Sequence, residues 1–133
     1  MRVSSDMSRV TEKQLECIAA AVLAVNAYPL ERAQRLLPAL RALGLLAPEQ
    51  ARAMSLERVI AGLEQAGYAR GKLTWMVAER LQGVMEACAT GRLDGLVDAL
   101  ERDDRAEGER LLDDVRGIGP HVASSAWALM RLL

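Results

Sequence analysis

The sequence predicts an all-α protein built as a single compact domain of about seven helices. Three observations carry this prediction. No segment alternates apolar and polar residues in the way that is typical of a half-buried strand. Hydrophobic residues make up 51% of the 133 residues, mostly Ala and Leu with no Phe, which favours packed helices. Apolar residues also recur at helical spacing between Ser, Thr, Gly and Pro.

Size and charge limit the classes of protein that need to be considered. The chain is long enough for one domain with a substantial core and too short for two. We expect residues 1–10 to form a frayed N-terminus and residues 11–133 to form the domain. A net charge of −1 gives no global basic field, so any contact with nucleic acid has to be local.

Cysteine usage and hydropathy predict the compartment. Cys17 and Cys88 are far apart and have no metal-ligand spacing, so we expect two small, buried apolar residues and no disulfide framework. There is no signal peptide and no apolar run of membrane-spanning length. These observations predict a soluble cytoplasmic protein with no membrane partner.

Capping residues or prolines mark the start of the expected helices. Thr11 and Gln14 form a capping box, and Ser55 has the place of an N-cap. Proline suits a first helical turn, because its missing N–H would be unpaired there in any case. The expected helices begin at or near Thr11, Pro29, Pro48, Ser55, Lys72, Leu93, Glu107 and Pro120.

Glycines and turn residues end these helices. The first helix is expected to run to about Val25 and is almost wholly apolar from Ile18, which predicts a central position. Residues 26–28 then break it, and we expect Pro38 to kink or end the second helix. The next helices are expected to end at or near Gly44, Ala53, Gly67, Gly91 and Leu100.

The connection before the last helix has the most specific pattern in the chain. Gly117 and Gly119 permit a tight turn, and Ile118 between them is expected to anchor in the core. Pro120 begins a helix, and the small Ala123 lets two helices approach closely. The free amides at such a helix N-terminus favour an anion.

This pattern resembles the helix-hairpin-helix motif of the endonuclease III-like DNA glycosylases, the HhH-GPD superfamily. The similarity covers roughly residues 15–133, being strong at the hairpin, moderate over Gly67–Lys72 and weak at Asn26. It implies a base-excision-repair fold and duplex DNA, including damaged DNA, as the partner. The alternative is an ordinary glycine-containing connection between helices.

The resemblance also implies how the hairpin holds DNA. Main-chain amides would donate to one phosphate, beside a polar contact from His121, and main-chain carbonyls would hold a monovalent cation. The implied amides belong to Gly117, Gly119 and Val122, and the implied carbonyls belong to Asp113, Val115 and Ile118. Such contacts carry no sequence information, so binding is expected to tolerate any sequence.

The chain differs from the family at the positions of the family's catalytic residues and cluster ligands. His121 stands where lyase-active members have a nucleophilic Lys, and imidazole cannot form their Schiff base. The family's catalytic Asp and the cysteines of its iron–sulfur cluster would lie beyond Leu133. We therefore expect no catalytic residue and no iron–sulfur cluster in this chain.

Four further residues are candidates for contacts to the duplex. By its place in the resemblance, Asn26 would enter the gap left by an extruded base, or it is simply a helix C-cap. Tyr68 would stack on a base, or it is a packing residue after a helix-ending glycine. Arg70 and Lys72 form the short basic stretch. Trp75 and Trp127 lie beside apolar residues and are expected in the core.

Charge is unevenly distributed along the chain. Residues 94–114 contain nine acidic residues against three arginines, and residues 27–92 contain nine basic residues against six acidic ones. We expect the acidic segment to be a solvated face that points away from DNA, and the basic segment to contribute to a docking surface.

Three functions are compatible with these observations. The first is a DNA-binding module without sequence specificity and without activity of its own. The second is a DNA glycosylase that acts with a partner chain or a missing segment. The third is a protein-interaction domain on the same fold, for which a partner chain or a homodimer would be needed.

Overall fold

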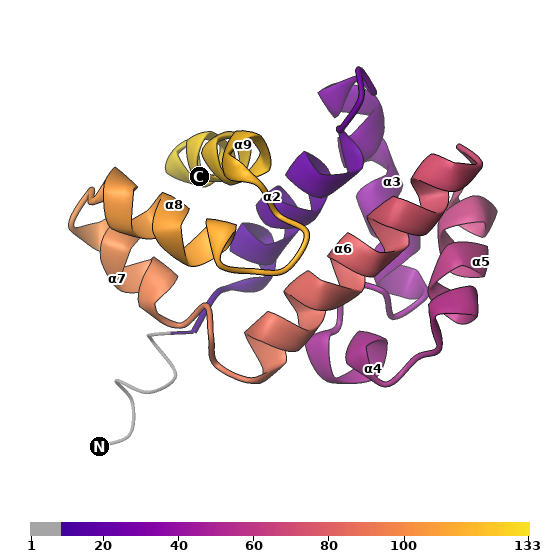
Figure 1. The fold of residues 1–133 in the computed structure, drawn as a ribbon, viewed down its shortest axis with the longest axis horizontal. Coiled ribbons are helices and arrows are strands. Elements are labelled where there is room, and N and C mark those ends of the chain that lie inside the picture. The colour runs from indigo at the N-terminus through magenta and orange to yellow at the C-terminus, as the bar shows by residue number, and fades with distance from the viewer. Residues whose placement is uncertain (1–8) are drawn as a thin grey trace.

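Helix α2 (Glu12–Leu23) lies at the centre of the molecule, with α3, α6 and α9 packed around it (Figure 1). Its start is the predicted capping box: the Thr11 hydroxyl accepts from the Gln14 amide at 3.1 Å, and the Gln14 side chain accepts from the Thr11 amide at 2.9 Å. Every residue from Ile18 to Leu23 is buried. The prediction of a central first helix is confirmed, although the helix ends two residues before Val25.

The structure is a computed structural model that describes residues 9–133, and this part forms eight helices and no strand. The protein is therefore an all-α single domain, and its eight helices in this part begin at or near the eight expected starts, against the overall expectation of about seven. None of the helices in residues 9–133 is long and apolar enough to cross a lipid bilayer. The remaining helices are α3 (Leu30–Ala42), α4 (Pro48–Arg52), α5 (Leu56–Ala66), α6 (Lys72–Ala89), α7 (Gly95–Glu101), α8 (Arg105–Asp113) and α9 (Pro120–Arg131).

Most boundaries follow the local signals in the sequence. The Ser55 hydroxyl accepts from the Arg58 amide at 3.2 Å and caps α5. Gly44, Gly67 and Gly91 follow their helices in the left-handed region, where glycine has no Cβ to clash. The expected N-terminal segment, 1–10, lies outside the described residues except for its last two, of which Val10 packs against the core.

Two expected helix boundaries differ in the structure. Of the two expectations for Pro38, an end of the helix is wrong, because α3 continues to Ala42 with Leu37 and Leu40 buried on either side of the proline. Their burial compensates for the hydrogen bond that the proline removes. Helix α8 begins at Arg105 rather than near Glu107, since Asp104 caps it by accepting from the Glu107 amide at 3.2 Å.

The last two helices pack together at a glycine rather than only at the expected alanine. Ala123 is fully buried, as predicted, but the closest approach is made by Gly108 on α8. A Cβ at Gly108 would overlap the six-membered ring of Trp127, which is 2% exposed. The absence of a side chain at Gly108 therefore makes room for the Trp127 indole and fixes the distance between α8 and α9.

We expect Gly108→Ala to lower the free energy of unfolding by about 1–3 kcal/mol, because the added methyl group must displace the Trp127 ring in a packed core. Chemical denaturation measures this change. Gly95→Ala is the matched control, since its Cβ would lie 3.4 Å from Leu111 Cδ1, an ordinary contact. Equal stability of the Gly108→Ala variant and the parent would contradict the packing described here.

Candidate nucleic-acid interface

Helices α8 and α9 are joined by a tight turn over residues 114–119, which reaches toward α6 (Figure 1). The turn is closed by a hydrogen bond of 3.0 Å from the Ile118 amide to the Val115 carbonyl. Gly117 has φ +90°, a conformation that glycine adopts without strain. Ile118 is 4% exposed, so its predicted place as a core anchor is confirmed.

The turn leaves backbone donors free at the start of α9. The amides of Gly117, Gly119 and Val122 donate to no group within residues 9–133. Gly119 is the N-cap of α9, and no side chain caps the helix there. Its backbone is extended (φ −92°, ψ −179°), and a Cβ at this position would meet no atom within 4 Å. Of the two glycines, Gly119 is therefore the one with open space beside it, since Arg80 packs on Gly117.

The carbonyls that were expected to hold a cation lie on the same turn. The Val115 carbonyl already accepts from the Ile118 amide, and the Asp113 and Ile118 carbonyls accept no backbone hydrogen bond within the described chain. Oxygen donors of this kind suit a monovalent cation, and the three carbonyls stay a predicted cation site. Within residues 9–133 no cluster of three His, Cys, Asp or Glu side chains is arranged to hold a metal ion.

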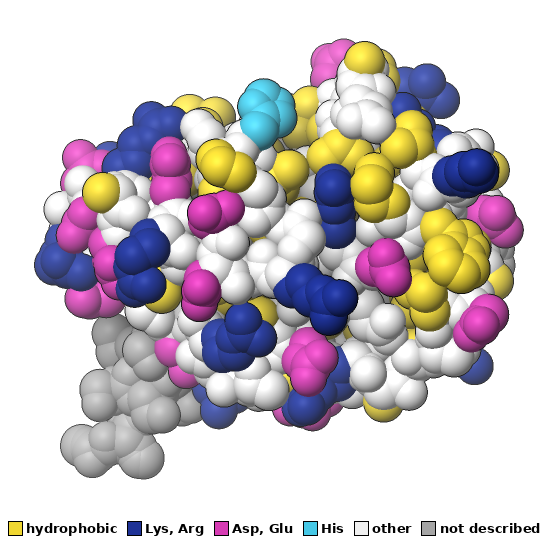
Figure 2. Space-filling view, viewed as in Figure 1, with side chains coloured by type: hydrophobic (Ala, Val, Ile, Leu, Met, Phe, Trp, Pro, Cys, Tyr) yellow, Lys and Arg dark blue, Asp and Glu magenta, His cyan; other side chains and the backbone are white. Residues whose placement is uncertain are grey.

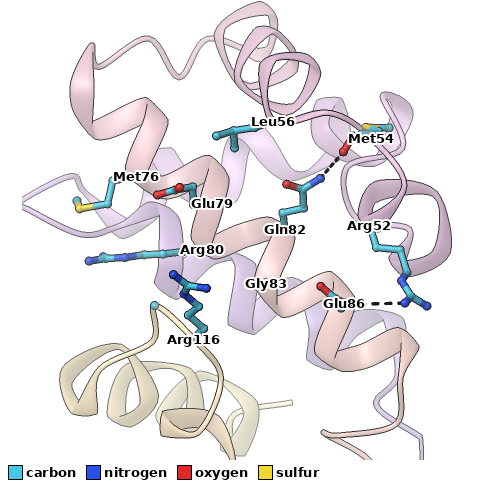
Figure 3. A pocket seen from close by; sticks show the side chains of 11 residues that line it. Arg52, Met54, Leu56, Met76, Glu79, Arg80, Gln82, Gly83, Glu86 and Arg116 are labelled. Carbon is cyan, nitrogen blue, oxygen red and sulfur yellow. Dashed lines mark hydrogen bonds and ion pairs between the residues drawn. The ribbon is translucent and has the colours of Figure 1, made fainter.

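Two arginines lie beside the turn, one on α6 and one in the turn itself. Arg80 packs its aliphatic stem on Gly117, where an added Cβ would lie 2.8 Å from the Arg80 Cγ. Arg116 rises from the turn beside it, and both line an open groove of about 520 Å³ along α6 (Figure 3). Neither arginine forms an ion pair in the described part of the chain.

The turn between α2 and α3 has a strained backbone. Asn26 and Ala27 have φ values of +55° and +65°, in the left-handed region that is unfavourable for residues with a Cβ. Both are exposed. Asn26 is not the C-cap of α2, which is Ala24. Strain of this kind persists only where surrounding contacts impose it.

Arg70 supplies those contacts. Its guanidinium donates to the Val25 carbonyl at 2.9 Å and to the Asn26 carbonyl at 3.0 Å. It also lies over the ring of Tyr28, at 5.0 Å from the ring centroid. Arg70 was expected to contact DNA, but its guanidinium is engaged inside the protein and holds the turn in place.

Tyr68 belongs to the same cluster, and the expectation that its ring stacks on a DNA base is wrong. Its side chain is fully buried, and its hydroxyl donates to the Leu23 carbonyl at 2.7 Å while accepting from Arg70 at 3.2 Å. Burial raises the pKa of the Tyr68 hydroxyl above its ordinary value, and the neighbouring Arg70 opposes this shift. The alternative interpretation, a packing residue, is the one that the structure supports.

Two of the predicted site residues share a groove with the strained turn: His121 and Val122 of α9 line it together with Val25 and Leu30, which flank the turn. Among the described residues, the hairpin glycines lie outside this groove, and Lys72 lines a different one on α6. Arg70 joins the start of α6 to the same turn. His121 is exposed, and Figure 2 shows its imidazole at the edge of the molecule. Lys72 is exposed at the first residue of α6.

Five of the nine acids in the acidic segment form ion pairs. Arg102 pairs with Asp98 and Asp104, at 3.2 and 3.3 Å. Further pairs join Arg105 to Glu109, Arg110 to Glu107 and Arg131 of α9 to Asp103. Arg110 lowers the pKa of the Glu107 carboxyl through this contact. With nine acids against three arginines the segment keeps a net negative charge, which repels a polyanion.

Sequence reasoning misplaced one aromatic residue. Trp75 was expected in the core but is 55% exposed on α6. The buried face of α6 is formed by Thr74, Val77, Ala78, Leu81, Val84, Met85 and Ala87. Trp75 lies two residues before Val77, which is about 200° around a helix, so the apolar spacing itself places this indole on the outer face.

We expect Tyr68→Phe to destabilise the fold by about 1–3 kcal/mol, because the buried Leu23 carbonyl loses its donor. Tyr28→Phe is the matched control, since no hydrogen bond involves the Tyr28 hydroxyl within residues 9–133.

Denaturation at several pH values gives a second readout. The raised pKa stabilises the fold below about pH 10, and this contribution is lost as pH rises through the higher folded-state pKa. The difference in stability between parent and Tyr68→Phe should therefore shrink above about pH 10, and a constant difference would contradict this assignment.

Comparisons with known proteins identify no relative of this chain. No protein-family model matches the chain, and no curated protein or solved structure matches it significantly. The interface has to be interpreted from its own residues.

Proposed function

We propose that this protein binds duplex DNA through the α8–α9 connection, without sequence specificity and without chemistry of its own. The proposed docking element is a helix-hairpin-helix, in which the amides of Gly117, Gly119 and Val122 donate to one phosphate. A helix N-terminus carries partial positive charge and free donors, which together favour an anion. This mode of binding suits a chain whose net charge is −1.

One observation carries the proposal: Val25 and Leu30, which flank the strained turn, line one groove with His121 and Val122 of the first turn of α9, although almost 100 residues separate them in sequence. Asn26 and Ala27 are exposed in an unfavourable conformation that Arg70 maintains. Strain that is actively held in place is typical of functional segments. A phosphate on the hairpin would position a duplex so that Asn26 faces its interior, as a residue that fills a gap between bases.

Backbone contacts determine the expected character of the binding. Amide donors recognise phosphate and not base edges, so affinity should be similar for unrelated sequences. Few side-chain cations take part, which predicts a shallow dependence of affinity on salt. Arg80 and Arg116 beside the hairpin would release about two counterions on binding, which sets the slope of log affinity against log salt concentration.

We expect Gly119→Val to weaken duplex binding by about tenfold or more, because the branched side chain covers the amides that would hold the phosphate. The fold should persist, since the backbone is extended and a Cβ meets no atom within 4 Å. Fluorescence anisotropy with labelled duplex, nicked and abasic DNA across a salt series measures the affinity. Ala61→Val adds the same branched group to an exposed position of α5 and serves as control.

Circular dichroism of both variants establishes that the fold is retained. A folded Gly119→Val variant that binds duplex as tightly as the parent would show that the connection is only a packing turn. The protein-interaction function would then be the leading one.

A second candidate is a DNA glycosylase whose catalytic carboxylate comes from a partner chain. The observation in its favour is an apolar groove of about 280 Å³ between α2, α3 and α9. Leu30 and Leu132 in this groove are 37% and 82% exposed, so a partner chain would find apolar surface there.

We expect the purified chain alone to give no covalent adduct with abasic DNA under borohydride and no release of a damaged base. The reason is that His121 has no amine with which to form a Schiff base. Turnover that a point mutation in this chain removes would overturn the proposal of a module without activity. Turnover that appears only after adding a second protein would support the glycosylase candidate.

A further inference from the structure

Trp75 has the largest side chain outside the core of residues 9–133. Its indole is 55% exposed on the outer face of α6, and it lines a shallow apolar groove of about 480 Å³ with Gly71, Lys72, Met76 and Glu79. An exposed tryptophan leaves a large apolar area in water, and tryptophans in binding surfaces often dominate the affinity. The groove around Trp75 is therefore a strong candidate for a binding surface.

This groove continues into the one beside the hairpin. Met76 and Glu79 line both, so a single surface runs along α6 from Trp75 to Arg80 and Arg116. Figure 3 shows Met76, Glu79 and Arg80 in succession on the face of α6, with Arg116 reaching toward them from the turn. The apolar end of the surface holds the indole, and the other end holds two guanidinium groups.

The charges on this surface favour a polyanion. Lys72, Arg80 and Arg116 have no ion-pair partner within residues 9–133, whereas Arg52 at the far end is shared between Glu49 and Glu86. Within the same residues, Glu79 is an acidic group of this surface that has no ion-pair partner. A phosphate on this surface would meet two unpaired guanidinium groups, Arg80 and Arg116, which line the same groove.

We propose that this surface, named here the α6 groove, binds a single-stranded segment of DNA next to the duplex that the hairpin holds. A base stacks on Trp75, and the backbone of the same strand passes Arg80 and Arg116. Trp75 and Arg80 lie five residue steps apart on α6, an axial rise of about 7.5 Å. The inference rests on the proposed function, and it specifies the substrate as DNA with an unpaired stretch.

The test compares three fluorescein-labelled probes: a blunt duplex, the same duplex with a 3′ or 5′ overhang of about 12 thymidines, and the free oligothymidine. Trp75→Ala should weaken binding of the overhang duplex by about 5- to 150-fold, the factor that corresponds to the loss of one stacked base. Binding of the blunt duplex should change less than about twofold, because the hairpin amides remain in place. Trp75→Phe should retain most of the affinity, because the phenyl ring still stacks.

Two more variants test the charge of the α6 groove. Arg80→Gln should weaken binding of the overhang duplex, and Arg35→Gln, which removes an exposed arginine of α3, is the matched control. Glu79→Gln should strengthen binding, because it removes the unpaired carboxylate beside the strand. Equal affinities of the parent and Glu79→Gln would count against a nucleic acid in this groove and in favour of a protein partner.

Tryptophan fluorescence gives a direct readout. The overhang duplex should quench the parent but not Trp75→Phe, in which Trp127 is buried at 2% exposure. Quenching that persists in Trp75→Phe, or overhang binding by Trp75→Ala as tight as in the parent, would overturn the inference. If the blunt duplex still binds in that case, the proposed function stands. Trp75-dependent binding of the overhang without any binding of blunt duplex would support the α6 groove and overturn the hairpin proposal instead.

Discussion

The end of the central helix depends on two side chains that lie more than 40 residues away in sequence. Carbonyls in the last turn of a helix have no partner within it, and leaving them buried and unpaired is unfavourable. Tyr68 donates to the Leu23 carbonyl, and Arg70 donates to the carbonyls of Val25 and Asn26. These bonds fix where α2 ends, hold the following turn in the left-handed region and attach the start of α6 to it.

Small residues set the remaining distances. Gly108 admits the ring of Trp127 between α8 and α9. Gly83 allows α6 to approach the turn, since a Cβ there would lie 3.2 Å from the Arg116 carbonyl. Gly117 in turn accommodates the Arg80 stem. The positions of the two arginines and of the hairpin amides are thus consequences of close helix packing and not of local sequence preference.

Local charge is more informative for this protein than net charge. Several acids of α7 and α8 are paired with nearby arginines, but the segment keeps more acids than arginines and stays negative. Within residues 9–133, Lys72, Arg80 and Arg116 of the α6 groove have no ion-pair partner. A chain with a net charge of −1 therefore presents a small positive surface beside a set of free amides, which is a combination suited to holding a phosphate backbone at one point.

The sequence by itself determined the all-α class and most helix boundaries, because caps, glycine stops and apolar spacing act over only a few residues. Thr11, Ser55 and Gly67 do in the structure what their local pattern predicts. The sequence also identified the turn around Ile118, since two glycines one residue apart are typical of a tight turn between helices. Only the tertiary structure decided which aromatic residue is available to a ligand. Tyr68 is buried because the end of α2 requires its hydroxyl, and Trp75 is exposed because the other face of α6 fills the core. The use of Arg70, the continuation of α3 through Pro38 and the groove that Val25 and Leu30 share with the start of α9 likewise depend on contacts between distant segments, which no local pattern encodes.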